Sequence, residues 1–327
     1  MACFNPSLMK CSQDYNTGEL FWKFCGNARR SDPREFGNYD SLSERGFFFV
    51  PIPCRHCLGC HLDYSRSWSN RMLLEFDQTK KGFFLTLTYR NSDLPKTDDG
   101  VPTLSKRDWQ LFMKRLREHF SSFRIRFFAA GEYGPKTLRP HYHAIIFGLD
   151  LSDLSDLRQI GKNEIGNQYY TSPTIEKIWS HGFVLLGQVN AHTCGYVARY
   201  VIKKHYKKSL PELRGAAQEF TLCSRRPGIG LGSAQDLLQR DSDYVTLTSG
   251  NEVKTFPVPK EVLKKCKQLD IFVDKVNQIK YYRFNDSNER LVSDLEFLGL
   301  SYDDYLSSKY RTFKESIKVL PERKDFK

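Results

Sequence analysis

Hydrophobic and polar residues follow regular periods in the middle of the chain and much weaker ones toward both ends. The β-branched and aromatic run at residues 83–89 predicts a strand, and apolar side chains spaced by three and four at residues 105–120 predict an amphipathic helix that begins after Ser105. The same two periods predict further strands at residues 124–130, 141–149 and 183–189, and further helices at residues 173–180, capped by Ser172, and 191–206. This order of strand, helix, strand, strand, helix and strand predicts an α+β fold. We expect a ferredoxin-like or RNA-recognition-motif-like βαββαβ core, in which helices cover one face of an antiparallel sheet.

The two flanking regions carry weaker patterns. Asn, Ser, Gly and Cys dominate residues 1–45 without a period, and the C-terminal stretch is charged. Short signals predict a buried strand at residues 46–53, a helix at 63–78, a hairpin formed by 244–248 and 253–258, and a helix at 260–269. We therefore predict a cysteine-bearing N-terminal extension (1–80), a central core (81–208) and a variable, peripheral C-terminal region (209–327).

Composition and charge narrow the class of protein. The 327 residues are 40% hydrophobic and 14% aromatic, which is enough apolar material for a packed core and argues against wholesale disorder. Lys and Arg number 50 against 38 Asp and Glu, so the net charge of +12 favours a polyanionic partner such as nucleic acid, with a merely basic soluble protein as the alternative. The N-terminus shows no apolar signal-peptide segment, and no run approaches the roughly 18 apolar residues of a membrane span. We therefore expect a cytosolic protein without a membrane partner.

Two histidines and a glutamate form the first group with chemical potential. His141 and His143 are two apart in a predicted strand, so both imidazoles project from one face while Tyr142 projects from the other. Glu132 lies at the end of the preceding strand, and residues 133–140 can form the hairpin loop that brings it beside His141. Two imidazoles and one carboxylate, with further coordination positions open, suit Mg²⁺ or Mn²⁺. The alternative is a pair of ordinary surface histidines and a solvated strand-end carboxylate.

Two tyrosines form the second group. Tyr196 and Tyr200 are four apart and Lys203 follows three later, so all three lie on one face of the predicted helix, which we expect to be exposed. A phenol can attack a phosphodiester and form a phosphotyrosine, but its ordinary pKa of about 10 makes it a weak nucleophile. A nearby metal ion and the Lys203 ammonium would favour the phenolate, and Lys204 is a second candidate for that role. The alternative is a pair of amphipathic tyrosines that only pack.

A cluster of cysteines stands apart from these groups. The chain has 9 cysteines, an odd number without a secretory signal, which favours reduced thiols or metal ligands over a disulfide framework. Cys54, Cys57 and Cys60 have the CxxCxxC spacing that can bind Zn²⁺, with unligated buried thiols as the alternative. A fourth zinc ligand would have to come from elsewhere, and the candidates are His56, Cys3, Cys11 and Cys25.

Positive charge is concentrated between residues 199 and 226, where Glu212 and Glu219 are the acidic residues. Such a stretch can follow a phosphate backbone, although a solvated basic helix end would look the same. The residues that we expect to contact nucleic-acid phosphates are Arg199, Lys204, Lys207, Lys208, Arg225 and Arg226.

Together these motifs resemble the His-hydrophobe-His (HUH) replication initiators. That family carries its histidine pair, here His141-Tyr142-His143, before a helix with one or two nucleophilic tyrosines, whereas conjugative relaxases have the opposite order. The similarity is greatest to the replication-associated proteins of the microviruses, particularly the gokushovirus branch of small single-stranded DNA phages. It rests on the strand at residues 84–89 and on the runs 53–60, 139–144 and 224–230, and covers roughly residues 50–232. Arg199 departs from the pattern, because related helices often carry Lys there, although either residue supplies a cation.

The resemblance implies site- and strand-specific nicking of viral origin DNA, presented as a single strand or as a supercoiled duplex. One tyrosine would take the 5′ end as a covalent phosphotyrosine. The free 3′-hydroxyl would prime a host polymerase, assisted by a host helicase, in the bacterial cytoplasm. The second tyrosine would cleave the regenerated origin, and rejoining would circularise the displaced strand.

Two alternatives to this function stay open at the level of sequence. An HUH-type transposase would share the chemistry but recognise the ends of an element, and cleavage of hairpin substrates would distinguish it. A non-catalytic RRM-like nucleic-acid-binding protein should show stacking aromatic residues on its central strands, where this sequence offers His141 and His143.

Overall fold

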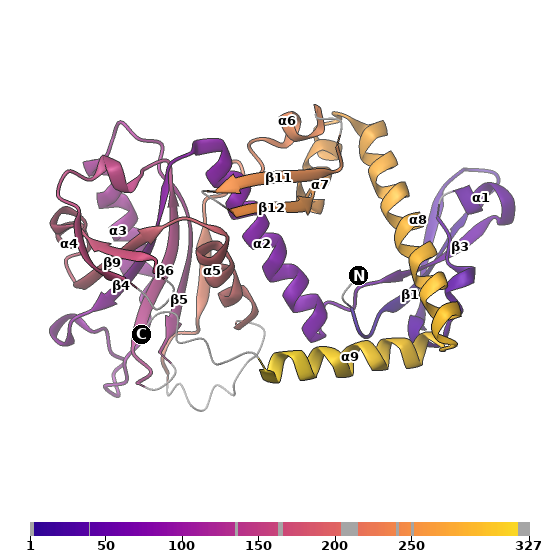
Figure 1. Ribbon diagram of the computed structural model, residues 1–327, viewed down its shortest axis with the longest axis horizontal. Helices are drawn as coiled ribbons and strands as arrows, with labels where there is room; N and C mark the ends of the chain where they lie inside the picture. Colours follow the sequence, from indigo (N-terminus) through magenta and orange to yellow (C-terminus); the bar gives the residue numbers. More distant parts are fainter. Residues whose placement is uncertain are drawn as a thin grey trace. The chain divides into compact units, whose positions relative to one another are not determined.

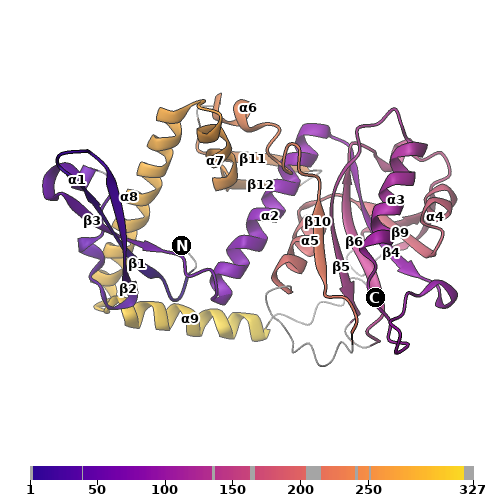
Figure 2. The same ribbon diagram turned by 180° about the vertical axis from the view of Figure 1, so that it is seen from behind.

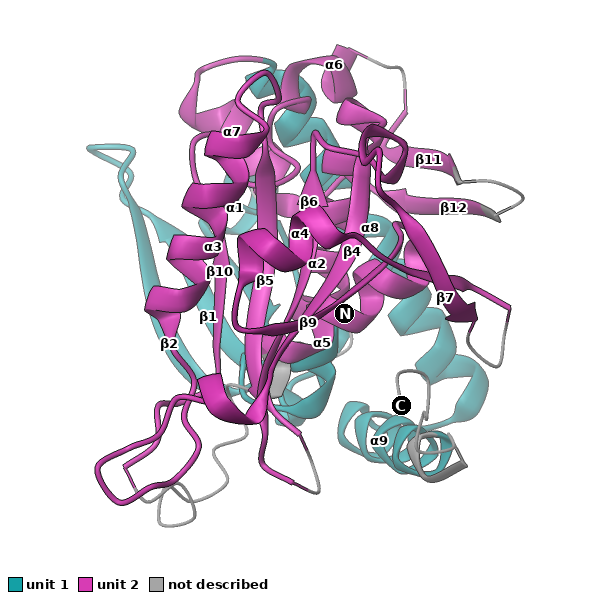
Figure 3. Ribbon diagram, turned by 90° about the vertical axis from the view of Figure 1, so that its left-hand side faces the viewer, with its two compact units in different colours: residues 1–63, 272–324 teal, residues 64–271, 325–327 magenta. Residues whose placement is uncertain are grey.

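The computed structural model describes residues 3–38, 40–134, 137–162, 166–203, 215–239, 242–249 and 252–319. The chain forms two compact units, Met1–Asp63 with Phe272–Lys324 and Tyr64–Ile271, which Figure 3 colours separately. This grouping differs from the three consecutive segments expected from sequence, because the two ends of the chain belong to the same unit.

The larger unit is built on a sheet that comprises seven antiparallel strands in the described part of the chain, in the order β10-β5-β6-β4-β9-β8-β7. These strands are β4 (Gly82–Tyr89), β5 (Arg126–Tyr133), β6 (Pro140–Phe147), β7 (Arg158–Lys162), β8 (Gln168–Thr171), β9 (Gly182–Gln188) and β10 (Phe220–Cys223). The strands predicted in the middle of the chain are β4, β5, β6 and β9, so the α+β class with an antiparallel sheet is confirmed.

The predicted βαββαβ succession is present with an insertion. Strands β7 and β8 come between β6 and the helix α4 (Pro173–Trp179), and β10 adds a further strand beside β5. No periodic signal predicted β7, because all of its side chains are exposed and none marks a buried face. The ferredoxin-like topology itself stays a prediction, since the sheet is larger than that core.

Helices α3 (Lys106–His119) and α4 cover one face of the sheet and form its main hydrophobic core. Trp109 and Phe112 of α3 and Trp179 of α4 are buried there against alternate residues of β4 and β6, Tyr142 among them. Both predicted N-caps are confirmed, because Ser105 accepts a hydrogen bond from the Asp108 amide and Ser172 from the Ile175 amide.

Helices α5 (Ala191–Lys203) and α2 (Leu58–Thr79) lie against the opposite face, as Figures 1 and 2 show from two sides. Trp68 of α2 packs on Phe128 of β5, with ring centroids 4.9 Å apart. The prediction that helices cover one face is therefore wrong. The run of buried residues in β4 shows why, because a strand covered on both sides has no solvated face to reveal by alternation.

The remaining elements of the larger unit follow β10. They are α6 (Ala234–Gln239), β11 (Tyr244–Ser249), β12 (Glu252–Pro257) and α7 (Lys260–Gln268), together with the 3₁₀ helices η3 (Asn91–Asp93) and η4 (Leu151–Asp153) that come earlier in the chain. Strands β11 and β12 pair as the predicted hairpin, and α7 is the predicted helix, so both predictions are confirmed.

The smaller unit combines the two ends of the chain. Its elements are β1 (Ser7–Gln13), β2 (Leu20–Asn27), η1 (Ala28–Arg30), η2 (Pro33–Glu35), α1 (Asp40–Arg45), β3 (Phe47–Ile52), α8 (Val273–Leu298) and α9 (Tyr302–Val319). The strands form an antiparallel sheet in the order β2-β1-β3. Leu8 and Phe36 share one core with Leu295 of α8 and with Tyr302 and Leu306 of α9.

Three expectations for this unit need correction. The charged C-terminal stretch is not a peripheral appendage, because α8 and α9 supply part of the core that the N-terminal strands need. Residues 1–45 contain two strands that no period revealed, because β2 is exposed along almost all of its length. Strand β3 lies where the buried strand was predicted, but Phe48 is its one buried residue.

In the described ranges, none of the helices combines the length and the hydropathy of a membrane-spanning segment.

Candidate functional site

The pairing of β5 with β6 brings the predicted metal ligands together. Glu132 lies directly opposite His141, and Ala130 lies opposite His143. Since side chains two apart share a face of a sheet, Glu132, His141 and His143 all project from one side. Tyr142 projects from the other side and is buried in the core beneath α3. Glu132 belongs to β5 itself, which continues to Tyr133, whereas the predicted strand ended at residue 130.

The three side chains converge closely enough to share one cation. Their ligand atoms all lie within 4.8 Å of one another. The Oε1 atom of Glu132 is 2.8 Å from Nε2 of His141 and 3.1 Å from Nε2 of His143. Glu132 is 4% exposed, and a buried carboxylate is stable only beside positive charge or strong hydrogen-bond donors. The burial and the donor set therefore fit a divalent cation.

Neighbouring groups orient both imidazoles. His141 Nδ1 lies 3.0 Å from the carbonyl oxygen of Arg139, which can only accept, so in the neutral ring the hydrogen is on Nδ1 and Nε2 keeps its lone pair. His143 Nδ1 lies 2.8 Å from Thr86 Oγ1 on the adjacent strand β4. Thr86 carries no motif of its own, so sequence reasoning missed it. Its pairing across from His143 became visible only with the register of β4 and β6.

The two tyrosines of α5 lie on the same histidine. Tyr196 Oη is 3.2 Å from His143 Nε2, and the ring of Tyr200 stacks on the imidazole of His143 with centroids 5.3 Å apart and an interplanar angle of 8°. The two phenol rings are themselves 5.3 Å apart, nearly perpendicular. The expectation of an exposed stripe is wrong, because α5 turns this face toward the sheet and Tyr200 is 8% exposed.

The environment makes both phenols harder to ionise. Burial raises the pKa of Tyr196, the Glu132 carboxylate raises it further, and the Arg199 guanidinium, 5.5 Å from the ring centroid, acts in the opposite direction. Burial also raises the pKa of Tyr200, and the neighbouring Tyr196 and Glu132 add to that effect. Positive charge placed next to Glu132 would oppose these shifts, which is the electrostatic change that a tyrosine nucleophile requires.

Several basic candidates fall outside what can be placed. Helix α5 ends at Lys203. The side chain of Lys203, and the whole of Lys204, Lys207 and Lys208, lie outside the described residues. Arg199 is exposed on α5.

Arg225 and Arg226 line a basic cavity of about 420 Å³ at the other end of β5. Arg126 begins β5 and Glu132 lies near its end, so the two sites are about 20 Å apart along the strand. The described side chains that line the cavity include no carboxylate; they are Arg117, Arg124, Ile125, Arg126, Phe127, Ser224, Arg225 and Arg226. Such a cavity suits a phosphate group.

Buried charges that sequence reasoning missed hold the segment after β10 in place. Glu75 of α2 forms an ion pair with Arg126 and accepts a hydrogen bond of 2.7 Å from the Gly230 amide. Arg71, one turn earlier, donates to the carbonyl of Ile229. Gly230 has φ +67°, and a Cβ atom there would lie 2.3 Å from the Arg71 carbonyl oxygen, so the position requires glycine. Arg71 and Glu75 flank an apolar run of α2, and charges inside such a run are the signal that could have revealed them.

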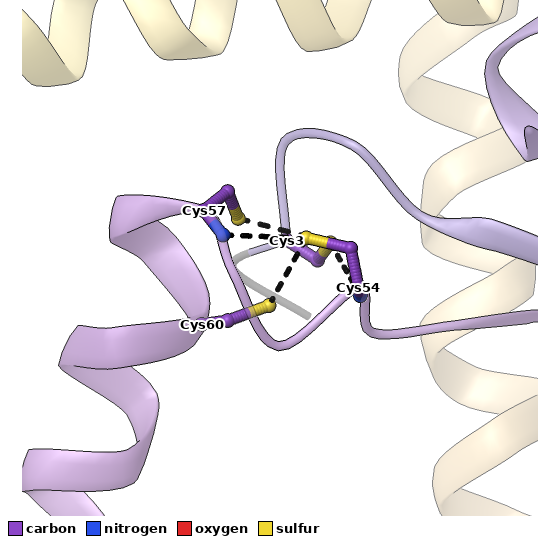
Figure 4. A group of neighbouring side chains, drawn as sticks. All are labelled: Cys3, Cys54, Cys57 and Cys60. Carbon is purple, nitrogen blue, oxygen red and sulfur yellow. Dashed lines mark hydrogen bonds between the residues drawn. The ribbon is translucent and has the colours of Figure 1, made fainter. Parts of the chain in front are cut away.

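The cysteine cluster gains a fourth member that the spacing left open. Cys3 joins Cys54, Cys57 and Cys60, and the four sulfurs lie within 4.8 Å of one another (Figure 4). The other candidates do not join them: Cys11 is buried in a small core with Leu42, and Cys25 is exposed on β2. His56 is not part of the group either.

Comparison with known proteins bears on the part of the chain that carries the tyrosines and histidines. A family model for the replication-associated protein ORF2 matches residues 82–205, which run from β4 to the end of α5. The replication-associated protein ORF2 of Spiroplasma virus 4 is 32% identical over 278 residues, which cover 82% of this chain and 84% of the relative. The replication-associated protein VP4 of Bdellovibrio phage phiMH2K is 36% identical over 160 residues, which cover 47% of this chain and 48% of the relative.

A third relative extends the similarity to another phage. The replication-associated protein ORF4 of Chlamydia phage 1 is 31% identical over 166 residues, which cover 48% of this chain and 39% of that protein. No solved structure matches the chain. The match to the Spiroplasma virus protein spans most of both chains, so the resemblance inferred from the motifs is confirmed. The chain belongs to the replication-associated protein ORF2 family of small phages.

Proposed function

We propose that this protein initiates rolling-circle replication of a small phage genome by cutting one strand of the origin with a tyrosine nucleophile. One observation carries the proposal: the Tyr196 hydroxyl and the Glu132 carboxylate both lie within 3.2 Å of the same nitrogen, Nε2 of His143. A phosphodiester bound there would meet the nucleophile and the metal ligands together. Proximity of that kind accounts for much of the rate enhancement in transfer reactions.

The chain's own residues divide the reaction between them. Glu132, His141 and His143 would hold Mg²⁺ or Mn²⁺, which when bound acts as a Lewis acid on a phosphate oxygen. Tyr196 or Tyr200 attacks the phosphorus, a bond from the phenol oxygen to phosphorus forms, and the bond from phosphorus to the 3′ oxygen breaks. The products are a 5′-phosphotyrosine and a free 3′-hydroxyl, whose hydrogen replaces the one lost by the phenol. No water is consumed, so the phosphoester energy is kept for rejoining.

Two tyrosines allow the cycle to close. Their rings are 5.3 Å apart on consecutive turns of α5, so either phenol can approach one bound phosphate. After one round of synthesis, the tyrosine that is still unmodified cleaves the regenerated origin. The new 3′-hydroxyl then attacks the first phosphotyrosine, which circularises the displaced strand and restores the phenol.

Basic residues away from the chemistry would hold the DNA. The cavity beside Arg225 and Arg226 is about 20 Å from Glu132, a distance that a nucleic-acid strand of several nucleotides can span. Arg199 is exposed on the nucleophile helix and would contact phosphates nearer to the cut. Lys203, Lys204, Lys207 and Lys208 continue this stretch in the sequence and are proposed for the same role, with Lys203 also offsetting charge on the reacting phosphate.

The partners follow from the products. A free 3′-hydroxyl on origin DNA is a primer, so a host polymerase would extend it and a host helicase would separate the strands. Both proteins, and the origin itself, would be met in the cytoplasm of the bacterial host.

A trapped covalent adduct tests the proposal. The full chain would be incubated with supercoiled DNA that carries the phage origin and with Mn²⁺, and the denatured products would be digested and mapped by mass spectrometry. We expect DNA attached to Tyr196 or Tyr200. An adduct on another residue such as Tyr89, or cleavage by water without any adduct, would contradict the proposal.

A further inference from the structure

Four cysteine sulfurs meet where the N-terminal residues cross the turn that leads into α2. Cys3 precedes β1, Cys54 and Cys57 lie in the turn after β3, and Cys60 is in the first turn of α2, as Figure 4 shows. Cys54 Sγ is 3.9 Å from Cys60 Sγ, and Cys57 Sγ is 3.8 Å from Cys3 Sγ. All four cysteines belong to the smaller unit, so its own fold brings them together.

These separations match a tetrahedral zinc site. Zinc binds thiolate sulfur at about 2.3 Å, and the edge of a tetrahedron of that size is about 3.8 Å. A disulfide would instead join the sulfurs in pairs at about 2.05 Å. The observed contacts therefore have the spacing of four ligands around one ion.

The backbone around the cluster is arranged to support negative charge on sulfur. The Cys57 amide donates to Cys54 Sγ at 3.3 Å, the Cys54 amide donates to Cys3 Sγ at 3.3 Å, and the Phe4 amide donates to Cys57 Sγ at 3.4 Å. Arg55 has φ 65°, which tightens the turn and returns the Cys57 amide to Cys54. Amide donors of this kind stabilise thiolates and fix their directions, as the outer shell of a metal site does.

We propose that Cys3, Cys54, Cys57 and Cys60 bind one Zn²⁺ ion in a closed site whose role is structural. Four thiolates fill a tetrahedral shell, so the ion has no position left for water or for a phosphate oxygen. The site ties the segment before β1 to the first turn of α2 across the turn after β3. Cys3 is the decisive ligand, because the CxxCxxC spacing by itself leaves the fourth position unassigned.

The zinc content of purified protein tests this site. The histidine site could also take up zinc, so the measurement is made on full-length chain carrying His141→Ala and His143→Ala. We expect about one zinc per chain by elemental mass spectrometry. Adding Cys3→Ser should weaken zinc binding by more than about 100-fold in a chelator competition, beyond what the loss of an outer-shell partner costs.

Controls and a second readout keep the test decisive. Cys25→Ser, which changes an exposed cysteine outside the cluster, should leave the zinc content unchanged. Replacement of zinc by Co²⁺ in the chain with intact cysteines should give the sulfur-to-cobalt charge-transfer bands of a four-thiolate tetrahedral site, whether or not the serine variants fold. The proposal would be overturned by zinc-free protein of unchanged stability, by a cobalt spectrum of nitrogen and oxygen ligands, by full zinc content in Cys3→Ser, or by an intact mass that reveals disulfides.

Discussion

Two groups of potential metal ligands lie among the described residues, and they differ in the properties that decide what a metal ion can do. Glu132, His141 and His143 offer one oxygen and two nitrogens from paired strands inside a large sheet. The cysteine group offers four sulfurs from a turn, a helix start and the N-terminal segment. The first group leaves coordination positions open beside two phenols, whereas the second has none to spare.

The difference shows how ligand number and scaffold separate chemistry from stability. The sheet would hold the histidines and the glutamate in place without help from an ion, because β5 and β6 are paired along their whole length. The cysteines come from segments with few other mutual contacts in the described structure, so an ion there would supply part of the fold itself. Loss of metal should therefore stop the reaction at one site and loosen the structure at the other.

The largest effect is expected from the phenols that lie beside the open site. Tyr196→Phe with Tyr200→Phe should lower formation of the covalent adduct by at least about 10³-fold, because no second nucleophile replaces them. Each single variant should still form the first adduct but should not circularise DNA. The measurement is a gel assay of nicked, covalently bound and circular products.

A matched tyrosine change separates chemistry from folding in that assay. Tyr244→Phe removes a phenol hydroxyl from an exposed side chain of β11 and should leave every product unchanged. Undiminished adduct formation by the double variant would show that the nucleophile lies elsewhere.

The next effect concerns the ligands of the open site. His141→Ala or His143→Ala should each reduce nicking by at least about 100-fold, because each removes one of three ligand atoms that lie within 4.8 Å of one another. DNA binding should persist, since the basic cavity is about 20 Å away along β5. Binding would be followed by fluorescence anisotropy and nicking by gel.

The exposed His119 of α3 provides the control for this pair of variants, and His119→Ala should behave as the unmodified chain does. Full cleavage by a chain lacking both His141 and His143, with EDTA present, would contradict a metal-dependent reaction.

Chelation should reveal the opposite behaviour at the cysteines. A strong zinc chelator should lower the melting temperature of the unmodified chain by about 5 °C, as a loss of about 2 kcal/mol would for a chain of this size. The variant without His141 and His143 should respond equally, whereas Cys3→Ser should start lower and respond little. If the histidine variant alone loses the response, the stabilising ion is at the wrong site in our comparison.

The two groups also differ in how far the sequence could predict them. His141, Tyr142 and His143 alternate between faces because the period of a strand is two, and a short hairpin places Glu132 beside them. Local geometry was enough for that site. Cys3 is separated from Cys54 by 51 positions, and no periodicity relates residues that only tertiary folding brings together.

Long-range packing also explains what the sequence left out of the fold. The second covered face of the sheet was not visible, because β4 reads as continuously apolar whether one or two layers of helices cover it. The buried ion pair between Glu75 and Arg126 joins a helix to a strand, and each residue alone looks like an ordinary surface charge. The shared core of both chain ends required knowledge of α8 and α9 in space.

The smallest expected effect separates DNA binding from both metal groups. Arg225 and Arg226 are exposed beside the basic cavity, and neither belongs to a ligand set. Replacing both with Ala should weaken origin binding and flatten its logarithmic dependence on salt by about one to two units, because each lost phosphate contact releases about one counterion fewer. Nicking at saturating DNA and the melting temperature with and without chelator should stay unchanged.

A second pair of charges shows whether this effect belongs to the cavity. Arg107 and Lys114 are exposed on α3, which covers the other face of the sheet from α5, so Arg107→Ala with Lys114→Ala removes the same total charge. That control should change the salt slope much less, since Coulomb attraction from a distant surface is screened within about 10 Å at ordinary ionic strength. Equal slopes for the two double variants would mean that net charge alone attracts the DNA, and the cavity would then have no part in holding it.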